Sequence, residues 1–236
     1  APEADPSGSP AFAALAARGL RFAQAYATAP TTLASHTSML TGLYPGGHGV
    51  HENGRRLPDQ VPLLAERLRE LGYATAAFVS GLPLKAPYGL ARGFDVYDDD
   101  FGDGRTERSS RETTDRALAW LAKPDGRPRF LWVHYYDPHE PYDPPEPFRS
   151  RFADDPYRGE IAAMDEQLGR LLAAFEAAPG GRGAGIVVAA DHGEGRGDHG
   201  EMLHGNLLYQ GVLRVPPVVA GAGVAPGTRS DPVSLR

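Results

Sequence analysis

Cysteine is missing from the sequence, which excludes disulfide bonds and thiolate metal sites but leaves the compartment of the protein open. Long apolar runs are missing too, since none approaches the roughly 18 residues of a membrane-spanning helix. The first ten residues lack the charged and then apolar layout of a signal peptide. The formal net charge is −6, and no stretch gathers basic residues. We therefore expect no membrane span in this chain and no nucleic-acid partner.

The composition is that of a folded protein with many loops. Hydrophobic residues make up 41% of the 236 residues, which is enough for one sizeable core. Glycine (29) and proline (22) are frequent, which indicates many turns around a regular scaffold. We find no internal repeat and no low-complexity segment.

Helical and extended patterns alternate along the chain. Five segments are predicted to be helices: 11–19, 33–43, 61–72, 111–122 and 158–177. Short apolar segments are predicted to be strands: 73–79, 129–133, 185–190 and 214–221, with 20–29 as a strand or an extended segment. Two acidic or proline-rich segments are predicted to be loops, 98–112 and 137–156, with the acidic run 98–100 solvated.

This alternation predicts an α/β fold. The segment 185–190 is apolar throughout, as in a strand whose two faces are both covered by helices. We therefore predict a sandwich with a largely parallel central sheet flanked by helices. The segment 214–221 contains two prolines, so we place it at an edge of the sheet.

Polar side chains follow three of the predicted strands, namely 73–79, 129–133 and 185–190. In open α/β sheets, ligands bind beyond the carboxyl ends of the strands. We therefore expect three separate loops to bring their polar residues to one edge of the sheet.

The densest polar cluster is DHGEGRGDHGEMLH, residues 191–204, whose glycines let the backbone fold tightly around a centre. Its candidate metal ligands are Asp191, His192, His199 and His204. Mixed carboxylate and imidazole ligands suit Zn or Mn, whereas Ca and Mg prefer oxygen ligands. The alternative is a solvated loop whose histidines cap helices. The apolar strand ahead of the cluster favours a metal site, in which His199 is the weakest candidate.

A second candidate is His139, in the segment HYYDPHEPY. The alternative is that Asp137-Pro138 forms an ordinary turn and His139 belongs to it. His134 falls inside the strand pattern, so we expect it to be a hydrogen-bonded interior residue. Asp165 is expected to be a helix-surface or helix-packing residue and not a ligand.

Thr32 precedes a helical run, and its role has two possible interpretations. In one it is an N-cap, whose hydroxyl accepts a backbone N–H. In the other the hydroxyl is a nucleophile at the positive end of a helix dipole, among N–H groups that favour an anion. A free threonine is a poor nucleophile, and a divalent cation at its oxygen would activate it. This segment alone leaves both readings open.

Four segments occur in the order that is typical of sulfatases. They are AYATAPTTLASHTSMLTGLYPGGHGV, GLARGFDVYDDDF, FLWVHYYDPHEPYDPP and ADHGEGRGDHGEMLHGNLLYQGVLRVPPVV. Over nearly its whole length, the chain resembles the sulfatase-like branch of the alkaline phosphatase superfamily. The resemblance implies the sandwich of that family and a catalytic domain spanning 1–236.

The resemblance also implies roles for single residues. The family signature Cys/Ser-x-Pro-x-Arg, ahead of a Leu-Thr-Gly helix end, maps onto residues 32–36 and 40–42. Thr32 then takes the place of the nucleophile and also contacts the metal. The divalent ion, with Zn or Mn favoured and Ca or Mg as alternatives, is expected on Asp191 and His192. His139 matches a substrate-contacting histidine and His204 takes the place of a lysine, so both are expected to be catalytic. We also expect Ser35, His36 and Lys85 to bind substrate, with a surface role as the alternative for Lys85.

Two departures from the signature bear on the reaction. Threonine cannot be oxidised to the formylglycine of true sulfatases, and His36 replaces the usual arginine. Threonine nucleophiles are familiar in phosphodiesterase, phosphonate-hydrolase and phosphotransferase relatives. We therefore expect a hydrolase of sulfate or phosphate esters that forms a covalent intermediate on Thr32, with a leaning towards phosphodiesters, phosphonates or phosphoryl transfer. Its expected substrates are small-molecule, lipid or glycan esters.

The ends of the chain also depart from the family. Relatives begin with a strand of the form D-x-x-R-x-D, which residues 1–10 lack, and this tail is expected to be disordered. Relatives also continue beyond residue 236. We therefore expect a domain truncated at both ends. The alternative function is a non-catalytic module, either a pseudoenzyme or an inactive fragment, that binds an anion without turning it over.

Overall fold

The computed structural model describes residues 8–181 and 183–236, so that the expectation of a disordered tail falls largely outside the described residues. The longer helices are α1 (Pro10–Arg18), α2 (Thr32–Thr41), α4 (Leu64–Glu70), α5 (Ser110–Leu121) and α7 (Pro156–Ala177). The four-residue helices are α3 (Pro45–His48), α6 (Phe148–Arg151) and α8 (Gln210–Leu213). All five predicted helices are present, and α1 begins at Pro10.

The strands belong to three hydrogen-bonded sheets. One is parallel, in the order β4 (Val96–Asp98), β3 (Ala74–Phe78), β5 (Arg129–Val133). The second has the order β6 (Ile186–Val188), β8 (Val218–Ala220), β1 (Leu20–Phe22), β9 (Gly227–Arg229). The third has the order β10 (Val233–Ser234), β2 (Ala25–Tyr26), β7 (Arg214–Val215). The predicted α/β fold with parallel strands and flanking helices is confirmed.

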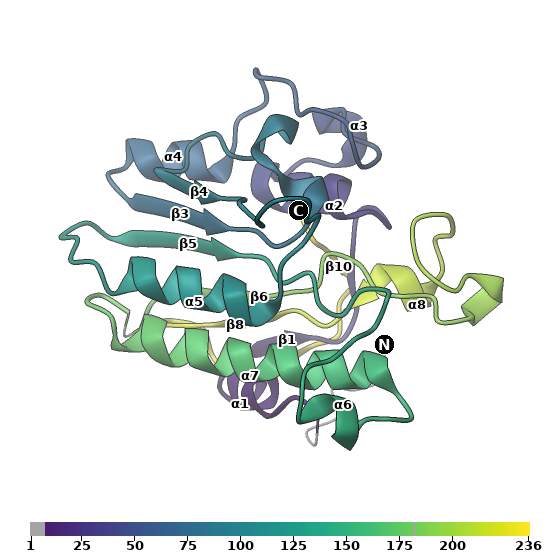
Figure 1. Ribbon diagram of the computed structural model, residues 1–236. Coiled ribbons are helices and arrows are strands. Elements are labelled where there is room, and N and C mark those ends of the chain that lie inside the picture. The colour runs from purple at the N-terminus through teal and green to yellow at the C-terminus, as the bar shows by residue number, and fades with distance from the viewer. Residues whose placement is uncertain (1–7, 182) are drawn as a thin grey trace.

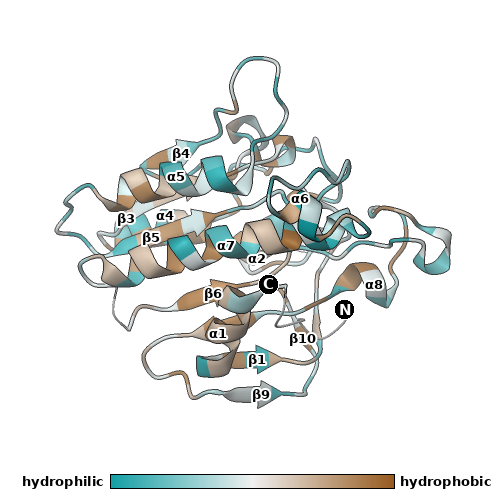
Figure 2. Cartoon of the chain, turned by 60° about the horizontal axis from the view of Figure 1, so that its bottom comes forward, coloured by the Kyte–Doolittle hydropathy of each residue, from teal (hydrophilic) through white to brown (hydrophobic). Residues whose placement is uncertain are grey.

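Strand β3 shows how the parallel sheet is covered on both faces. Successive side chains of a strand point to opposite faces. Ala76 and Phe78 accordingly pack with Ala117 of α5, and Ala77 between them packs with Ala65 of α4. Helices α5 and α7 run side by side over the first face, while α4 lies on the other (Figures 1 and 2).

The second sheet corrects two predictions. Strand β8 pairs with β6 on one side and with β1 on the other, so it is an interior strand. The edge prediction is wrong because Pro216 and Pro217 fall between β7 and β8, where no ladder hydrogen bond is lost. Strand β6 is not covered on both faces, since the side chain of Val187 is 69% exposed.

The acidic run at 98–100 is also not a solvated loop. Asp98 ends β4 and forms ion pairs with Arg108, which is fully buried, and with Arg116. Asp99 accepts a hydrogen bond from the backbone N–H of Ala86. These contacts tie the segment after β4 to the start of α5, because a buried guanidinium requires a charged or polar partner.

Asp165 of α7 is a packing residue, as predicted, and it is only 2% exposed. Its two carboxylate oxygens accept the backbone N–H groups of Ala11 (2.7 Å) and Phe12 (2.8 Å) in the first turn of α1. These are N–H groups that a helix cannot satisfy internally, and a negative charge there also matches the helix dipole. Helix α1 thus takes its cap from α7.

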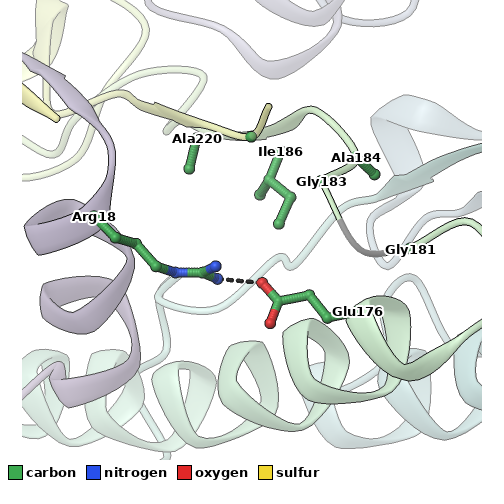
Figure 3. A pocket seen from close by; sticks show the side chains of 8 residues that line it. Arg18, Glu176, Gly181, Gly183, Ala184, Ile186 and Ala220 are labelled. Carbon is green, nitrogen blue, oxygen red and sulfur yellow. Dashed lines mark hydrogen bonds and ion pairs between the residues drawn. The ribbon is translucent and has the colours of Figure 1, made fainter. Parts of the chain in front are cut away.

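A cavity of about 340 Å³ lies between α1, α7 and the beginning of β6 (Figure 3). The ion pair between Arg18 and Glu176 crosses it, and Ile186, the first residue of β6, lines it. The cavity therefore opens at the amino end of β6, opposite the edge where the sequence predicts a ligand site.

We expect Asp165→Ala to lower the free energy of unfolding by about 2 kcal/mol, since two buried N–H groups lose their acceptor. Urea unfolding followed by circular dichroism measures the change. The control is Glu166→Ala, an exposed neighbour on the same helix. Equal stability of the two variants would contradict this role of Asp165.

Candidate active site

The carboxyl ends of three strands meet the beginning of α2. Ser80 follows β3, His134 directly follows β5, and Asp191 lies just beyond β6. The hydroxyl of Ser80 donates to the carbonyl of His134 (2.6 Å), and the ring of His134 meets the ring of His36 edge-on, with 4.9 Å between centroids. In Figure 1 the arrows of β3 and β5 point towards the side of the molecule on which α2 lies. The predicted gathering of polar loops at one edge is thus present.

Thr32 is the first residue of α2, and its N-cap is Thr31, so the reading of Thr32 as the N-cap is wrong by one position. The N–H of Leu33 donates to the side-chain oxygen of Asn53 (2.9 Å), which leaves the Thr32 hydroxyl outside the capping bonds. The residue is 4% exposed, and its Oγ1 lies 3.4 Å from Nε2 of His192.

Asp191 is at the centre of the site. Its Oδ2 atom is buried, has no hydrogen-bond partner, and lies 3.4 Å from both Nδ1 of His36 and Nε2 of His192. Burial by itself raises the pKa of this carboxyl, but the surrounding imidazoles, His192 most of all, hold the pKa at about 2. The carboxylate is therefore ionised at neutral pH.

The imidazoles around Asp191 are arranged as ligands. Burial lowers the pKa of His36, and it lowers the pKa of His134 to about 3, so both rings are neutral at pH 7. An N–H at Nδ1 of His192 donates to the carbonyl of Gly193 (2.9 Å), which leaves the lone pair of Nε2 free. Metal-binding histidines usually hold their second nitrogen in this way.

These residues fit a divalent metal ion. A buried, ionised carboxylate oxygen without a partner is costly, and a cation beside it removes the cost. Ligands bonded to a tetrahedral ion at about 2.0–2.1 Å lie about 3.4 Å apart. The distances from Nε2 of His192 to Oδ2 of Asp191 and to Oγ1 of Thr32 are both 3.4 Å. Carboxylate, imidazole and hydroxyl together suit Zn or Mn.

His204 lies beside this group. Its ring packs against His192, with 4.1 Å between centroids, and its Nδ1 is 3.1 Å from a carboxylate oxygen of Glu194. Burial lowers the pKa of His204, but the hydrogen bond and the charge of Glu194 outweigh burial, and the net pKa is raised. This ring, paired with a carboxylate, takes the position at which the family resemblance expects a lysine.

His139 completes the cluster from the loop after β5. It is half-buried, stacks on Tyr136 with 4.1 Å between centroids, and meets the ring of His204 edge-on at 5.4 Å. Its backbone N–H donates to Glu160 of α7 (3.0 Å), whose other carboxylate oxygen accepts the N–H of Asp143 (2.7 Å). Glu160 therefore fixes both ends of the segment that carries His139.

Two predicted residues lie apart from the cluster. The ammonium group of Lys85 lies over the ring of Phe101, 4.8 Å from its centroid. His199 stacks on Tyr209 with 3.6 Å between centroids and pairs with Asp198, and its side chain is about half exposed. Ser35 is closer, because its hydroxyl donates to the backbone carbonyl of Asp191 (2.6 Å) and ties α2 to the metal-site loop. The roles of these three residues stay predictions.

Sequence reasoning missed the acidic residues that hold the site in place: Glu160, Glu194 and Glu201. Glu201 is 7% exposed and accepts the N–H groups of Asn206 and Leu207, which shapes the loop around His204. For Glu194 and Glu201 the only signal in the sequence was the density of carboxylates in residues 191–204, and Glu160 had none, because backbone N–H groups leave no trace in side-chain patterns.

Comparisons with known proteins identify the family of this chain. A family model described as Sulfatase matches residues 3–235. The chain belongs to the sulfatase family. Among curated sulfatases, a choline-sulfatase of Rhizobium meliloti is 24% identical over 96% of this chain and 60% of its own length. A Δ4,5-hexuronate-2-O-sulfatase of Bacteroides thetaiotaomicron is 23% identical over 89% of this chain and 56% of its own length.

Solved structures support the same fold. A phosphonate monoester hydrolase of Agrobacterium radiobacter superposes with a TM-score of 0.78 at 20% identity, over 96% of this chain and 66% of that one. The sulfatase-like fold predicted from the four segments is therefore confirmed. The chain spans only about 60% of the length of the curated sulfatases that it matches.

The pH dependence of stability tests Glu160. Burial first, and then the charge of Asp137, raises the pKa of this carboxyl from 4.5 to about 7 against the effect of its two N–H donors. A raised pKa in the folded state means that the free energy of unfolding falls as the pH rises from about 4.5 to 7, by an amount on the order of 2 kcal/mol. We expect Glu160→Gln to flatten this part of the profile.

Urea unfolding between pH 4 and 8 measures the profile. Glu166→Gln, an exposed change on the same helix, should keep the wild-type slope. A Glu160→Gln profile that is parallel to the wild type would show that Glu160 titrates normally.

Proposed function

We propose that this protein is a metal-dependent hydrolase of sulfate or phosphate esters and that Thr32 forms the covalent intermediate. The single observation that carries the proposal is the position of the Thr32 hydroxyl, 3.4 Å from His192, which itself lies 3.4 Å from the unpartnered Oδ2 of Asp191. Membership in the sulfatase family supports it. A divalent ion held by Asp191 and His192 would supply positive charge that favours the ionised hydroxyl.

The residues of the chain carry the remaining steps. Oγ1 of Thr32 forms a bond to sulfur or phosphorus, its proton is released to solvent, and the bond to the ester oxygen breaks. The protonated ring of His204 donates a proton to the departing alkoxide. Water then hydrolyses the ester on Thr32, which restores the hydroxyl and releases sulfate, a phosphate monoester or a phosphonate, according to the substrate. His139 faces the same space from the other side of His204 and binds an oxygen of the transferred group.

The charge of the site favours esters with one negative charge on the transferred group. Around Thr32, the described residues supply one cationic ring, His204, and that ring is already paired with Glu194. His36 is neutral where the family signature has an arginine. We therefore propose sulfate monoesters, phosphodiesters and phosphonate monoesters as substrates, ahead of dianionic phosphate monoesters. The fold shared with a phosphonate monoester hydrolase is consistent with this choice.

Thr32→Ala should lower turnover by about a thousandfold or more, because the nucleophile is lost, while metal content stays at the wild-type level. Thr32→Ser keeps a hydroxyl and should retain measurable activity. Release of 4-nitrophenol from the aryl sulfate, the aryl phosphodiester and an aryl phosphonate measures the effect, and mass spectrometry of quenched enzyme detects the ester on Thr32.

Full turnover by Thr32→Ala would rule out this mechanism. Wild-type protein that binds these esters but neither cleaves them nor carries an adduct would instead be an anion-binding protein.

A further inference from the structure

Three side chains near Thr32 form a second group of possible metal ligands. His36, His134 and Asp191 each offer one ligand atom, and these three atoms lie within 4.8 Å of one another. Within residues 8–181 and 183–236, this is the one group of three or more histidine and carboxylate side chains that meets this condition. The three residues come from α2, from the end of β5 and from the loop after β6, so the fold itself brings them together.

Both histidines of this inner group are buried, and the side chain of Asp191 is partly buried. His36 and His134 are 5% and 7% exposed. The indole ring of Trp132, which packs on the hydrophobic core, lies 5.5 Å from the ring of His36. Two histidines and a carboxylate buried against apolar residues need partners, yet Oδ2 of Asp191 has none.

Hydrogen bonds orient the two rings. Nδ1 of His36 lies 2.9 Å from the carbonyl of Thr32, and an N–H there leaves Nε2 free for an ion. Nδ1 of His134 lies 3.3 Å from Oγ of Ser80, whose own proton goes to the carbonyl of His134. The backbone N–H of Ser80 also points at this nitrogen (3.4 Å). A ring that binds an ion through Nε2 carries its proton at Nδ1 and donates it to Oγ of Ser80. Backbone and hydroxyl partners of this kind hold metal-binding histidines in proteins.

Two of the three inner residues, His36 and His134, lie apart from the atoms proposed to hold the catalytic ion, and Asp191 is shared. His192 does not belong to the inner group, and its Nε2 lies instead beside the Thr32 hydroxyl, with its ring against His204. Asp191 is the one residue common to both. An ion held by the inner group would therefore bind whether or not Thr32 reacts.

We propose that His36, His134 and Asp191 form an inner site for a transition-metal ion that prefers nitrogen ligands, zinc first. Two imidazoles and one carboxylate are a ligand set for zinc, manganese or iron and a poor one for calcium or magnesium, which require more oxygen atoms. Zinc at tetrahedral geometry would draw the three ligand atoms together by about 1 Å, to a spacing of about 3.4 Å. The family signature carries an arginine at position 36. The inner site therefore depends on the histidine that this chain has there.

Metal binding by the whole protein tests the site. Protein stripped with a chelator is titrated calorimetrically with Zn²⁺ and with Ca²⁺, and Co²⁺ serves as a spectroscopic probe of nitrogen ligation. His36→Gln and His134→Gln should each weaken Zn²⁺ binding at this site at least tenfold and remove the Co²⁺ bands that this site contributes. The control His51→Gln changes an exposed histidine outside both sites and should bind both metals like the wild type.

His192→Ala separates the inner site from the proposed function. We expect it to keep the inner Co²⁺ bands, and their loss would overturn the proposal. Two other results would also overturn the proposal. One is wild-type protein that binds neither Zn²⁺ nor Co²⁺, and the other is folded His36→Gln and His134→Gln proteins that bind Zn²⁺ like the wild type. The Co²⁺ spectrum of His192→Ala contains no nitrogen-ligand band from the proposed catalytic site, so it decides even if a substitution at His36 or His134 prevents folding. Turnover by Thr32→Ala bears only on the proposed function.

Discussion

The carboxylate of Asp191 is the group on which the arrangement of the site depends. It is ionised, its Oδ2 is buried, and no side chain or backbone group donates to that atom. Its partners among the described residues are histidines and not arginine or lysine, and burial lowers the pKa of two of the neighbouring rings, His36 and His134. A buried anion of this kind is stable only beside a cation. The charge of the site is therefore completed by a ligand, and this makes a metal site the simplest physical account of it.

The backbone around Asp191 is shaped to bring the histidines of its loop together. A Cβ atom on Gly193 would lie 2.1 Å from the carbonyl oxygen of Gly211, and one on Gly195 would lie 2.3 Å from that of Glu201. Glycine is the only residue that fits such approaches. They let the chain turn back after β6 so that His204, twelve residues beyond His192, packs on its ring. Glu194 and Glu201 then fix the returning strand of the loop.

Local patterns predicted the helices and the edge of the sheet that carries the site. The spacing of apolar residues and the direction of a strand are both properties of short segments. They failed where a residue's partner is remote in sequence. The prolines at 216 and 217 suggested an edge strand, yet they occupy the break between β7 and β8. Glu160 looks like an ordinary helix residue, and its function comes from two backbone N–H groups in a loop about twenty residues earlier. His134 was correctly expected to be interior, but its position beside His36 and Asp191 required the fold.

The two departures from the family signature belong together. An arginine at position 36 would place a permanent positive charge next to Oδ2 of Asp191, satisfy that oxygen, and compete with any ion for it. The neutral ring of His36 leaves the oxygen free and adds a nitrogen ligand. A threonine hydroxyl, unlike the hydrate of an aldehyde, needs strong positive charge nearby to ionise. In the proposed mechanism, histidine in place of arginine suits a threonine nucleophile, since the site gives up a fixed charge on the substrate and would gain one from a metal ion.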